Sequence, residues 1–284
     1  MKRRDFLAAS CAAGLGAVTA GAMAQDAQPR QRGARGQTGT RPQGQAAARP
    51  QGQARDIYEL KQYKCASAEQ ARGVDAFLEK AMIPALNRLG IEQVGVFHER
   101  QAVAEPTIYV LLRHRSARTV TTTTASLLQD ETYLADGAAF LDAGNENRPY
   151  QRIESSLLLA FEGMRQLEAP SKKDTRVFQL RIYESPTVKT GQKKIEMFNV
   201  GEIDIFRKTG LNPVFFGEAI TGTKIPNLTY MLGFDDAAAQ DKAWQTFVKH
   251  PEWLALRAKP EYADKKILCG ITNILLKPAS YSQI

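Results

Sequence analysis

The amino-acid sequence predicts an α+β fold built by tandem duplication. Residues 57–63 read Ile-Tyr-Glu-Leu-Lys-Gln-Tyr, and residues 177–183, which lie 120 positions later, read Val-Phe-Gln-Leu-Arg-Ile-Tyr. Both stretches place apolar and polar side chains on opposite sides with the period of two that a β-strand requires. The residues that follow each stretch repeat one order of strands and helices. The chain is therefore expected to contain two copies of one unit.

The first copy carries the signals of four strands and two helical regions. Ser67 and Gln70 have the spacing of a capping box, and apolar residues then recur at helical spacing until Gly90. Four consecutive threonines at 121–124 weaken the second helical region, because β-branched side chains lose rotamer freedom in a helix. After the strand at 57–63 we expect the first helix, strands at 94–98 and 108–112, a helical region at 116–141 and a strand at 153–159.

The second copy repeats this order. Its expected elements are a helix at 193–209, strands at 214–218 and 228–233, a helix at 235–249 with Asp235 as N-cap, and a strand at 267–276. Gly210, which closes its first helix, lies 120 positions after Gly90. Tyr109 and Tyr230 are expected to mark the same point in the two third strands, with one residue inserted between them. Each copy thus has the β-α-β-β-α-β order of a ferredoxin-like unit.

Two such units are expected to form one closed barrel. The helices of a ferredoxin-like unit cover only one face of its sheet, so the bare faces can pack together and form a dimeric-type α/β barrel with an enclosed space. Tyr58, Leu60, Phe178 and Leu180 are then expected beneath the helices. The opposite side of the two strands, here called the polar row, is expected to point into the barrel. It comprises Glu59, Lys61, Tyr63, Gln179, Arg181 and Tyr183.

The polar row is the candidate ligand-binding site. Charged groups in an enclosed space must be paired or must meet a ligand or water, because burying an unpaired charge is costly. Tyr63 and Tyr183 would stack on a ligand or form hydrogen bonds with it, and Lys61 or Arg181 would bind an anionic group. The alternative is that Glu59 pairs with Lys61 or Arg181 and that the row holds no ligand.

No catalytic or metal-binding motif is recognisable. The histidines, His98, His114 and His250, lack the spacing of metal ligands, so neither a metal site nor a cofactor is predicted. The sequence also lacks the Gly-x-Ser-x-Gly motif, a phosphate-binding loop and a dinucleotide fingerprint. His250 either ends a helix, where a cation meets the negative end of the dipole, or contacts a ligand at the barrel mouth. Trp244 and Trp253 are expected in the core.

The first 55 residues are expected to lie outside the fold. Residues 1–24 combine a basic start containing Arg3 and Arg4 with a short apolar run and an Ala-Met-Ala cleavage site, which is typical of a twin-arginine export signal. The expected location is therefore the periplasm or the secreted fraction, and a lipoprotein anchored at Cys11 is the alternative. Residues 25–55, rich in Gln, Arg, Gly, Ala and Pro, are expected to form a disordered linker.

The excess positive charge is concentrated in these first 55 residues. The chain has 38 Lys and Arg against 30 Asp and Glu, and removing nine cations and two anions before residue 56 leaves 29 against 28. A nearly neutral folded part predicts no specific nucleic-acid binding. The linker is either a solvated tether or a contact to an anionic surface, and a homo-oligomer is a further option. Cys65 and Cys269 are expected to be buried thiols rather than a disulfide.

Several segments resemble the NIPSNAP family. They are the two repeated strands, Val-Phe-Phe-Gly-Glu at 214–218, Leu-Thr-Tyr-Met-Leu at 228–232, His-Pro-Glu-Trp at 250–253 and the closing residues 277–282. The resemblance covers about residues 56–284, which divide into repeats at 56–168 and 175–284. It implies a dimeric α/β-barrel fold and no defined activity.

Two functions are compatible with the sequence. The first is an exported binder or cofactor-free enzyme that takes a small molecule into the space between its two sheets. The second is a non-enzymatic interaction or membrane-associated module with a filled barrel and a basic tether. A polar cavity in the barrel would favour the first function, and a densely packed barrel axis would favour the second.

Overall fold

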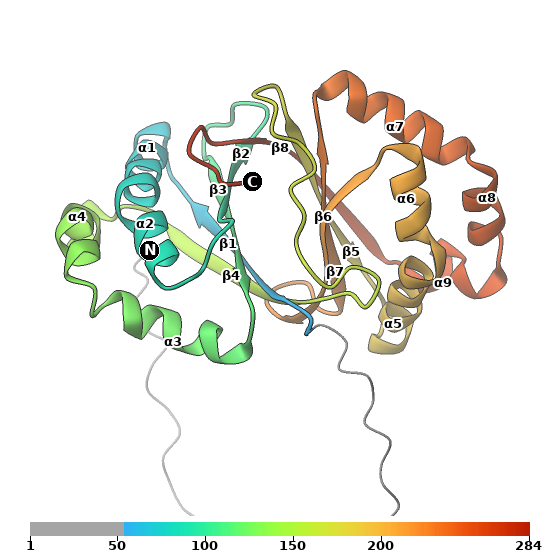
Figure 1. The fold of residues 1–284 in the computed structure, drawn as a ribbon, viewed down its shortest axis with the longest axis horizontal. Coiled ribbons are helices and arrows are strands. Elements are labelled where there is room, and N and C mark those ends of the chain that lie inside the picture. The colour runs from blue at the N-terminus through green and yellow to red at the C-terminus, as the bar shows by residue number, and fades with distance from the viewer. Residues whose placement is uncertain (1–53) are drawn as a thin grey trace, which may run out of the picture. The chain divides into compact units, whose positions relative to one another are not determined.

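The computed structural model describes residues 54–284. The predicted export signal and residues 25–53 of the predicted linker lie outside the described residues. Within the described part, the strands form one closed antiparallel barrel in the order β1-β3-β2-β8-β5-β7-β6-β4 (Figure 1).

Each repeat supplies four strands and its own set of helices. The first repeat contains β1 (Ile57–Lys64), α1 (Ala68–Phe77), α2 (Ile83–Arg88), β2 (Gly95–Glu99), β3 (Thr107–His114), α3 (Ala117–Leu127), α4 (Glu131–Leu141) and β4 (Arg152–Ala160). The second contains β5 (Val177–Glu184), α5 (Val188–Met197), α6 (Ile203–Thr209), β6 (Asn212–Thr221), β7 (Asn227–Phe234), α7 (Ala237–Lys249), α8 (Pro251–Arg257), α9 (Asp264–Ile267) and β8 (Gly270–Pro278).

Two seams between the repeats close the barrel. Strand β2 pairs with β8, and β4 pairs with β6, in both cases antiparallel. The helices of the first repeat cover one side of the barrel and those of the second repeat cover the opposite side (Figure 1). The predicted α+β barrel of two ferredoxin-like units is thereby confirmed.

Side-chain caps fix where the helices begin. Ser67 Oγ accepts a hydrogen bond from the Gln70 N–H at 3.2 Å at the start of α1, as the sequence predicts. The N-cap of α7 is Asp236, whose side chain accepts from the Ala239 N–H at 2.8 Å. The prediction of Asp235 as this cap is wrong, because its carboxylate is bound elsewhere, by the Ser171 hydroxyl and the Lys173 ammonium.

The first helices of the two repeats share a π-helical turn. It occupies Leu78–Met82 between α1 and α2, and Phe198–Glu202 between α5 and α6, which is a spacing of 120 residues. Helix α5 begins at Val188, five residues before its predicted start, so α1 and α5 are also 120 residues apart. Such wide turns shift the phase of the side chains that follow and are frequent at functional sites.

The two faces of β1 and β5 are reversed relative to the prediction. Tyr58, Leu60, Phe178 and Leu180 are at most 2% exposed and belong to one apolar core that draws on every strand of the barrel. Rings of different repeats meet in it, since the centroids of Phe97 and Phe178 are 4.8 Å apart. These side chains fill the barrel axis, where polar groups would lack water and partners. The polar row therefore points outward, towards the helices.

The third strands correct a second prediction. Lys61 pairs with Val110 and Arg181 pairs with Tyr230, so Val110 is the counterpart of Tyr230 at a spacing of 120 residues. Tyr109 instead packs in the barrel axis, whereas Tyr230 packs beneath the helices. The predicted insertion between these strands is wrong, because a shift of one residue moves a side chain to the opposite face of a sheet.

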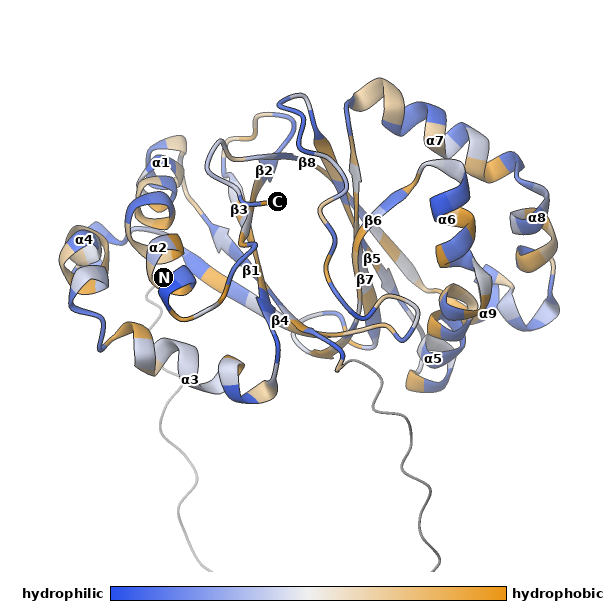
Figure 2. Ribbon diagram, viewed as in Figure 1, coloured by the Kyte–Doolittle hydropathy of each residue, from blue (hydrophilic) through white to orange (hydrophobic). Residues whose placement is uncertain are grey.

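Helix α3 covers the first repeat more loosely than α7 covers the second. Only Leu127 is buried along α3, whereas α7 buries Gln240, Ala243 and Phe247. The middle of α3 is pale in Figure 2, since its threonines are neither strongly apolar nor charged. The hydroxyls of residues 121–123 donate to carbonyls one turn earlier in the same helix. Such bonds slightly destabilise a helix and add no contact to the sheet.

We expect the backbone amides of α3 to exchange with deuterium faster than those of α7. Few buried apolar contacts hold α3, so its local opening free energy should lie well below that of α7. Hydrogen-exchange mass spectrometry of peptides from 117–127 and 237–249 measures the difference. Equal protection of the two helices would show that α3 is held as firmly as its counterpart.

Candidate ligand site between the sheet and the helices

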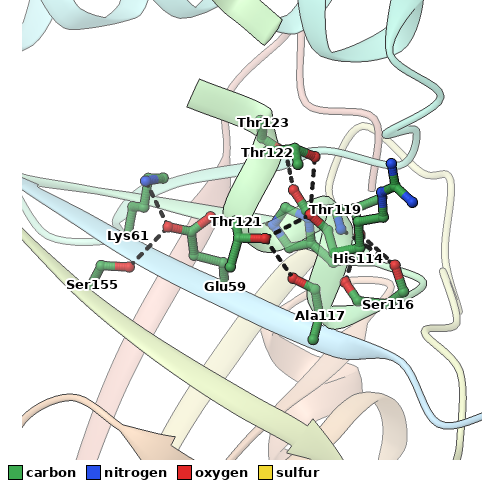
Figure 3. Close-up of polar contacts among 11 residues, drawn as sticks. Glu59, Lys61, His114, Ser116, Ala117, Thr119, Thr121, Thr122, Thr123 and Ser155 are labelled. Carbon is green, nitrogen blue, oxygen red and sulfur yellow. Dashed lines mark hydrogen bonds and ion pairs between the residues drawn. The ribbon is translucent and has the colours of Figure 1, made fainter. Parts of the chain in front are cut away.

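In the first repeat, the polar row forms a cluster around the carboxylate of Glu59 (Figure 3). Lys61 Nζ lies 2.6 Å from Glu59 Oε1, and the Ser155 hydroxyl donates to the same oxygen at 3.1 Å. The other oxygen, Oε2, lies 3.2 Å from Nε2 of His114. These side chains come from the adjacent strands β1, β3 and β4. Of the two pairings considered for Glu59, the structure forms the one with Lys61.

The surroundings of Glu59 keep it ionised. Burial acts to raise the pKa of its carboxyl, but the hydrogen bond from His114 and the charge of Lys61 outweigh burial and lower the pKa to about 2. Because an ionised carboxylate can only accept a hydrogen bond, His114 donates one from its Nε2–H to Glu59 Oε2. The other ring nitrogen, Nδ1, is buried and has no hydrogen-bond partner among residues 54–284.

In the second repeat, the polar row meets aromatic rings of α7 and β5. The guanidinium carbon of Arg181 lies 4.9 Å from the ring centroid of Trp244 and 5.3 Å from that of Tyr183. Gln179 accepts a hydrogen bond from the Trp244 indole N–H at 2.6 Å and donates to Asn273 at 2.7 Å. The hydrogen bond from Trp244 to Gln179 fixes the indole beside Arg181. No carboxylate in the described part of the chain forms an ion pair with Arg181, and its Nε is buried without a partner.

The two tyrosines of the polar row are core residues. Tyr63 is 3% exposed and packs edge-on against Tyr150, with ring centroids 5.6 Å apart. Tyr183 is 8% exposed, and its hydroxyl accepts a hydrogen bond from that of Tyr230 at 3.0 Å. The structure therefore splits the predicted site in two: Glu59, Lys61 and Tyr63 lie in the first repeat, and the other three residues lie in the second.

The sequence profile of the NIPSNAP family matches residues 178–283. The second repeat is a NIPSNAP domain. Its match includes all strands of that repeat, from β5 to β8, together with Arg181 and Trp244.

A solved structure of low sequence identity has a similar fold, and two NIPSNAP proteins match over a shorter part of the chain. A putative monooxygenase from Lactobacillus acidophilus NCFM is 10% identical, with a TM-score of 0.52, and covers 79% of this chain and 94% of its own. A NIPSNAP-like domain protein from Burkholderia xenovorans is 18% identical over 38% of this chain and 90% of its own, with a TM-score of 0.35. A NIPSNAP family protein from Agrobacterium tumefaciens is 17% identical, with a TM-score of 0.34, and the match covers 38% of this chain and 96% of its own. No curated protein matches the chain.

The NIPSNAP domain contains a buried ion pair that sequence analysis did not identify. Lys194 Nζ lies 2.9 Å from Glu202 Oε2, and both side chains are at most 3% exposed. The Lys194 ammonium also lies 4.8 Å from the ring centroid of Phe198. Burial raises the pKa of Glu202, although Lys194 acts against this. The signal was present in the repeat, because Val74 and Met82 occupy the same positions in the first copy.

The remaining candidates behave as structural residues. His250 separates α7 from α8, as the helix-end interpretation predicts. Trp253 lies in the core, and Trp244 is partly buried against it. Cys65 is buried as predicted, but Cys269 is exposed, and both are free thiols.

Two classes of site are absent from the described residues. No cluster of three or more His, Cys, Asp or Glu side chains between residues 54 and 284 is arranged to hold a metal ion. None of the helices in this part of the chain has the length and hydropathy needed to cross a membrane.

Proposed function

We propose that the protein binds a small planar organic carboxylate in its NIPSNAP domain, with Arg181 as the anchor. The observation that carries this proposal is a guanidinium group that lies within 5.3 Å of the centroids of two aromatic rings and has no carboxylate partner in the described residues. The ligand would lie between the outer face of the sheet and α7. The site is therefore outside the barrel, because apolar side chains fill the space between the two sheets.

The charge distribution around Arg181 supports an anionic ligand. The buried carboxylate of Glu202 acts on Arg181 electrostatically, but Lys194 neutralises it at 2.9 Å. One positive charge is left over in a region where water is scarce, and such a charge binds an anion more strongly than a charge in bulk water does. Arg181 is also partly exposed, so a solute can reach it.

The geometry supports a planar carboxylate rather than a spherical anion. A guanidinium group presents parallel N–H donors that match the two oxygens of a carboxylate. The partly buried ring of Trp244 offers a flat apolar surface beside these donors. A ligand with an aromatic ring next to its carboxylate would use both features.

We expect benzoate to bind the wild-type protein and to bind Arg181→Gln about 10- to 100-fold more weakly. This factor corresponds to losing about 1.5–3 kcal/mol of charge-assisted hydrogen bonding. Isothermal titration calorimetry measures both affinities. Arg207→Gln is the matched control, since Arg207 lies in the same repeat but is already paired with Glu168 at 2.8 Å.

Two results would refute this proposal. The first is unchanged benzoate affinity in Arg181→Gln, and the second is an equal loss in Arg207→Gln. Native mass spectrometry of the purified protein offers an independent search. A retained carboxylic acid should be detected on the wild-type protein and be absent from Arg181→Gln.

The filled barrel favours a second candidate function, a non-enzymatic interaction module. A densely packed axis is what this function requires, and the apolar core of all strands meets that requirement. Here the basic residues before Asp56 would contact an anionic surface. Sedimentation with phosphatidylserine vesicles tests it: binding by the full chain and its loss after removal of residues 25–53 would favour the module. Benzoate binding would be unaffected by this truncation.

A further inference from the structure

We infer that His114 and Glu59 form a second site, in the first repeat, that accepts a proton from a weakly acidic hydroxyl group of a ligand. This site is distinct from the carboxylate site proposed for the NIPSNAP domain and does not depend on it. It rests on the geometry of the Glu59 cluster, on an unpartnered ring nitrogen and on the loose cover provided by α3.

Glu59 sets the orientation and tautomer of the imidazole. Its Oε2 lies 3.2 Å from His114 Nε2, and its Oε1 is bound by Lys61 at 2.6 Å and Ser155 at 3.1 Å (Figure 3). A carboxylate accepts hydrogen bonds only, so Nε2 must carry the proton. In the neutral ring, the lone pair is then on Nδ1. A carboxylate that holds one imidazole nitrogen while the other stays basic is the arrangement of a general base.

The basic nitrogen has no partner of its own. His114 is fully buried, and Nδ1 has no hydrogen-bond donor among the described residues. A buried acceptor without a donor costs the whole desolvation of that atom, so native structures rarely leave one empty. A hydroxyl group of a ligand would supply the missing donor.

Helix α3 provides the cover through which a ligand would enter. His114 lies beside the first turn of α3, near Ser116 and Ala117 (Figure 3). Along this helix only Leu127 is buried, and it lies at the far end from His114. The threonine hydroxyls satisfy their own helix and not the sheet. Displacement of the first turn would therefore break few buried apolar contacts, and we take it as the route by which a ligand reaches the imidazole.

The proton transfer balances within the cluster. The O–H bond of the ligand breaks, an N–H bond forms at Nδ1, and the electron pair stays on the ligand oxygen. The resulting imidazolium lies between the Glu59 carboxylate and the ligand oxyanion. Lys61 already neutralises the negative charge of Glu59. Protonation of His114 therefore gives the cluster one net positive charge, which matches the charge of the ligand oxyanion. The transfer requires a hydroxyl that is at least about as acidic as an imidazolium, as in an activated phenol, because a weaker acid would keep its proton.

The second repeat lacks this dyad. Gln179 occupies the position of Glu59, and Phe234 occupies that of His114, at the spacing of 120 residues. A neutral amide cannot hold an imidazolium as a carboxylate does, and Phe234 has no basic nitrogen. Proton acceptance is therefore specific to the first repeat, whereas Arg181, which has no carboxylate partner among residues 54–284, belongs to the second.

The test uses 4-nitrophenol, whose acidity is close to that of imidazole, and nitrogen-15 NMR of the histidine rings. In the free wild-type protein at neutral pH we expect His114 to carry its proton on Nε2 alone. On saturation with 4-nitrophenol its ring should become an imidazolium, and the nitrophenolate absorption should exceed that of the same 4-nitrophenol solution without protein. His98, which is paired with Asp75 at 3.0 Å, serves as the internal control and should not change.

His114→Gln assigns the NMR signals and should abolish the part of the nitrophenolate absorption that belongs to this site. Any nitrophenolate held at Arg181 would remain in this variant, so failure of one site is separable from failure of the other. A proton on Nδ1 in the free protein, or His114 signals that do not respond to saturating 4-nitrophenol, would overturn the inference. Both readings come from the wild-type protein, so they hold even where a variant fails to fold.

Discussion

We expect Lys194→Met to destabilise the protein by about 3–5 kcal/mol, the largest effect predicted for a single substitution. The substitution removes the only ion-pair partner that Glu202 has in the described residues and leaves its carboxylate buried at 3% exposure. An uncompensated charge in a low-dielectric interior accounts for a loss of this size. Urea unfolding followed by circular dichroism measures it.

The first repeat supplies a matched control for this prediction. Val74 and Met82 occupy the positions of Lys194 and Glu202, and both repeats form the same helix with the same π-helical turn. The double substitution Lys194→Val with Glu202→Met should therefore restore most of the lost stability, since replacing both partners of a buried pair by apolar residues is often neutral. A double variant as unstable as the single one would show that the loss comes from packing and not from charge.

The penalty of Lys194→Met should also shrink as the pH falls. Burial raises the pKa of Glu202, and removing Lys194 takes away the partner that opposes this rise. A raised folded pKa means that the folded state binds more protons than the unfolded state, so stability is gained as the pH falls towards the unfolded pKa of about 4.3. If the difference in unfolding free energy between variant and wild type stayed constant from neutral to mildly acidic pH, Glu202 would not be charged in the folded protein.

The second large effect is expected for Glu59→Gln, with a loss of up to about 3 kcal/mol near pH 7. The hydrogen bond from His114 and the charge of Lys61 outweigh burial and lower the pKa of Glu59 from 4.5 to about 2, and each unit is worth about 1.4 kcal/mol. A neutral amide also leaves Lys61 without its partner at 2.6 Å. Chemical unfolding of wild type and variant gives the difference.

The pH dependence has the opposite sign to that of Glu202. A lowered folded pKa stabilises the protein above the unfolded pKa of about 4.3, and this contribution is lost as the pH falls towards 2. The unfolding free energies of wild type and Glu59→Gln should therefore show their full difference at neutral pH and converge near pH 2. Glu154→Gln on the neighbouring strand is the control, because its contact to Lys64 is 3.9 Å long and exposed, and such pairs contribute about 0–1 kcal/mol. Equal losses in both variants would refute a special role for Glu59.

The sequence by itself determined the repeat and the elements of the fold. The spacing of 120 residues predicted two equivalent units, and the structure places the first helices and the third strands at this spacing. The alternation in β1 and β5 divided their residues correctly into two faces, and the Ser67 cap marked the start of α1. These features depend on residues close in the chain, whose backbone geometry fixes their relation.

Only the tertiary structure decided which face of the strands lines the barrel. An alternating pattern states that Tyr58 and Glu59 point to opposite sides, but either side of a strand can be covered by helices or by a second sheet. The side chains of the barrel axis are buried from water, so the axis takes the row that needs no hydrogen-bond partners, while the outer face receives partners from strands and helices. His114 and Glu59 lie 55 residues apart in the chain, and Lys194 meets Glu202 across a π-helical turn. Such contacts arise from strand register and helix phase, which the closed barrel sets and no local pattern records.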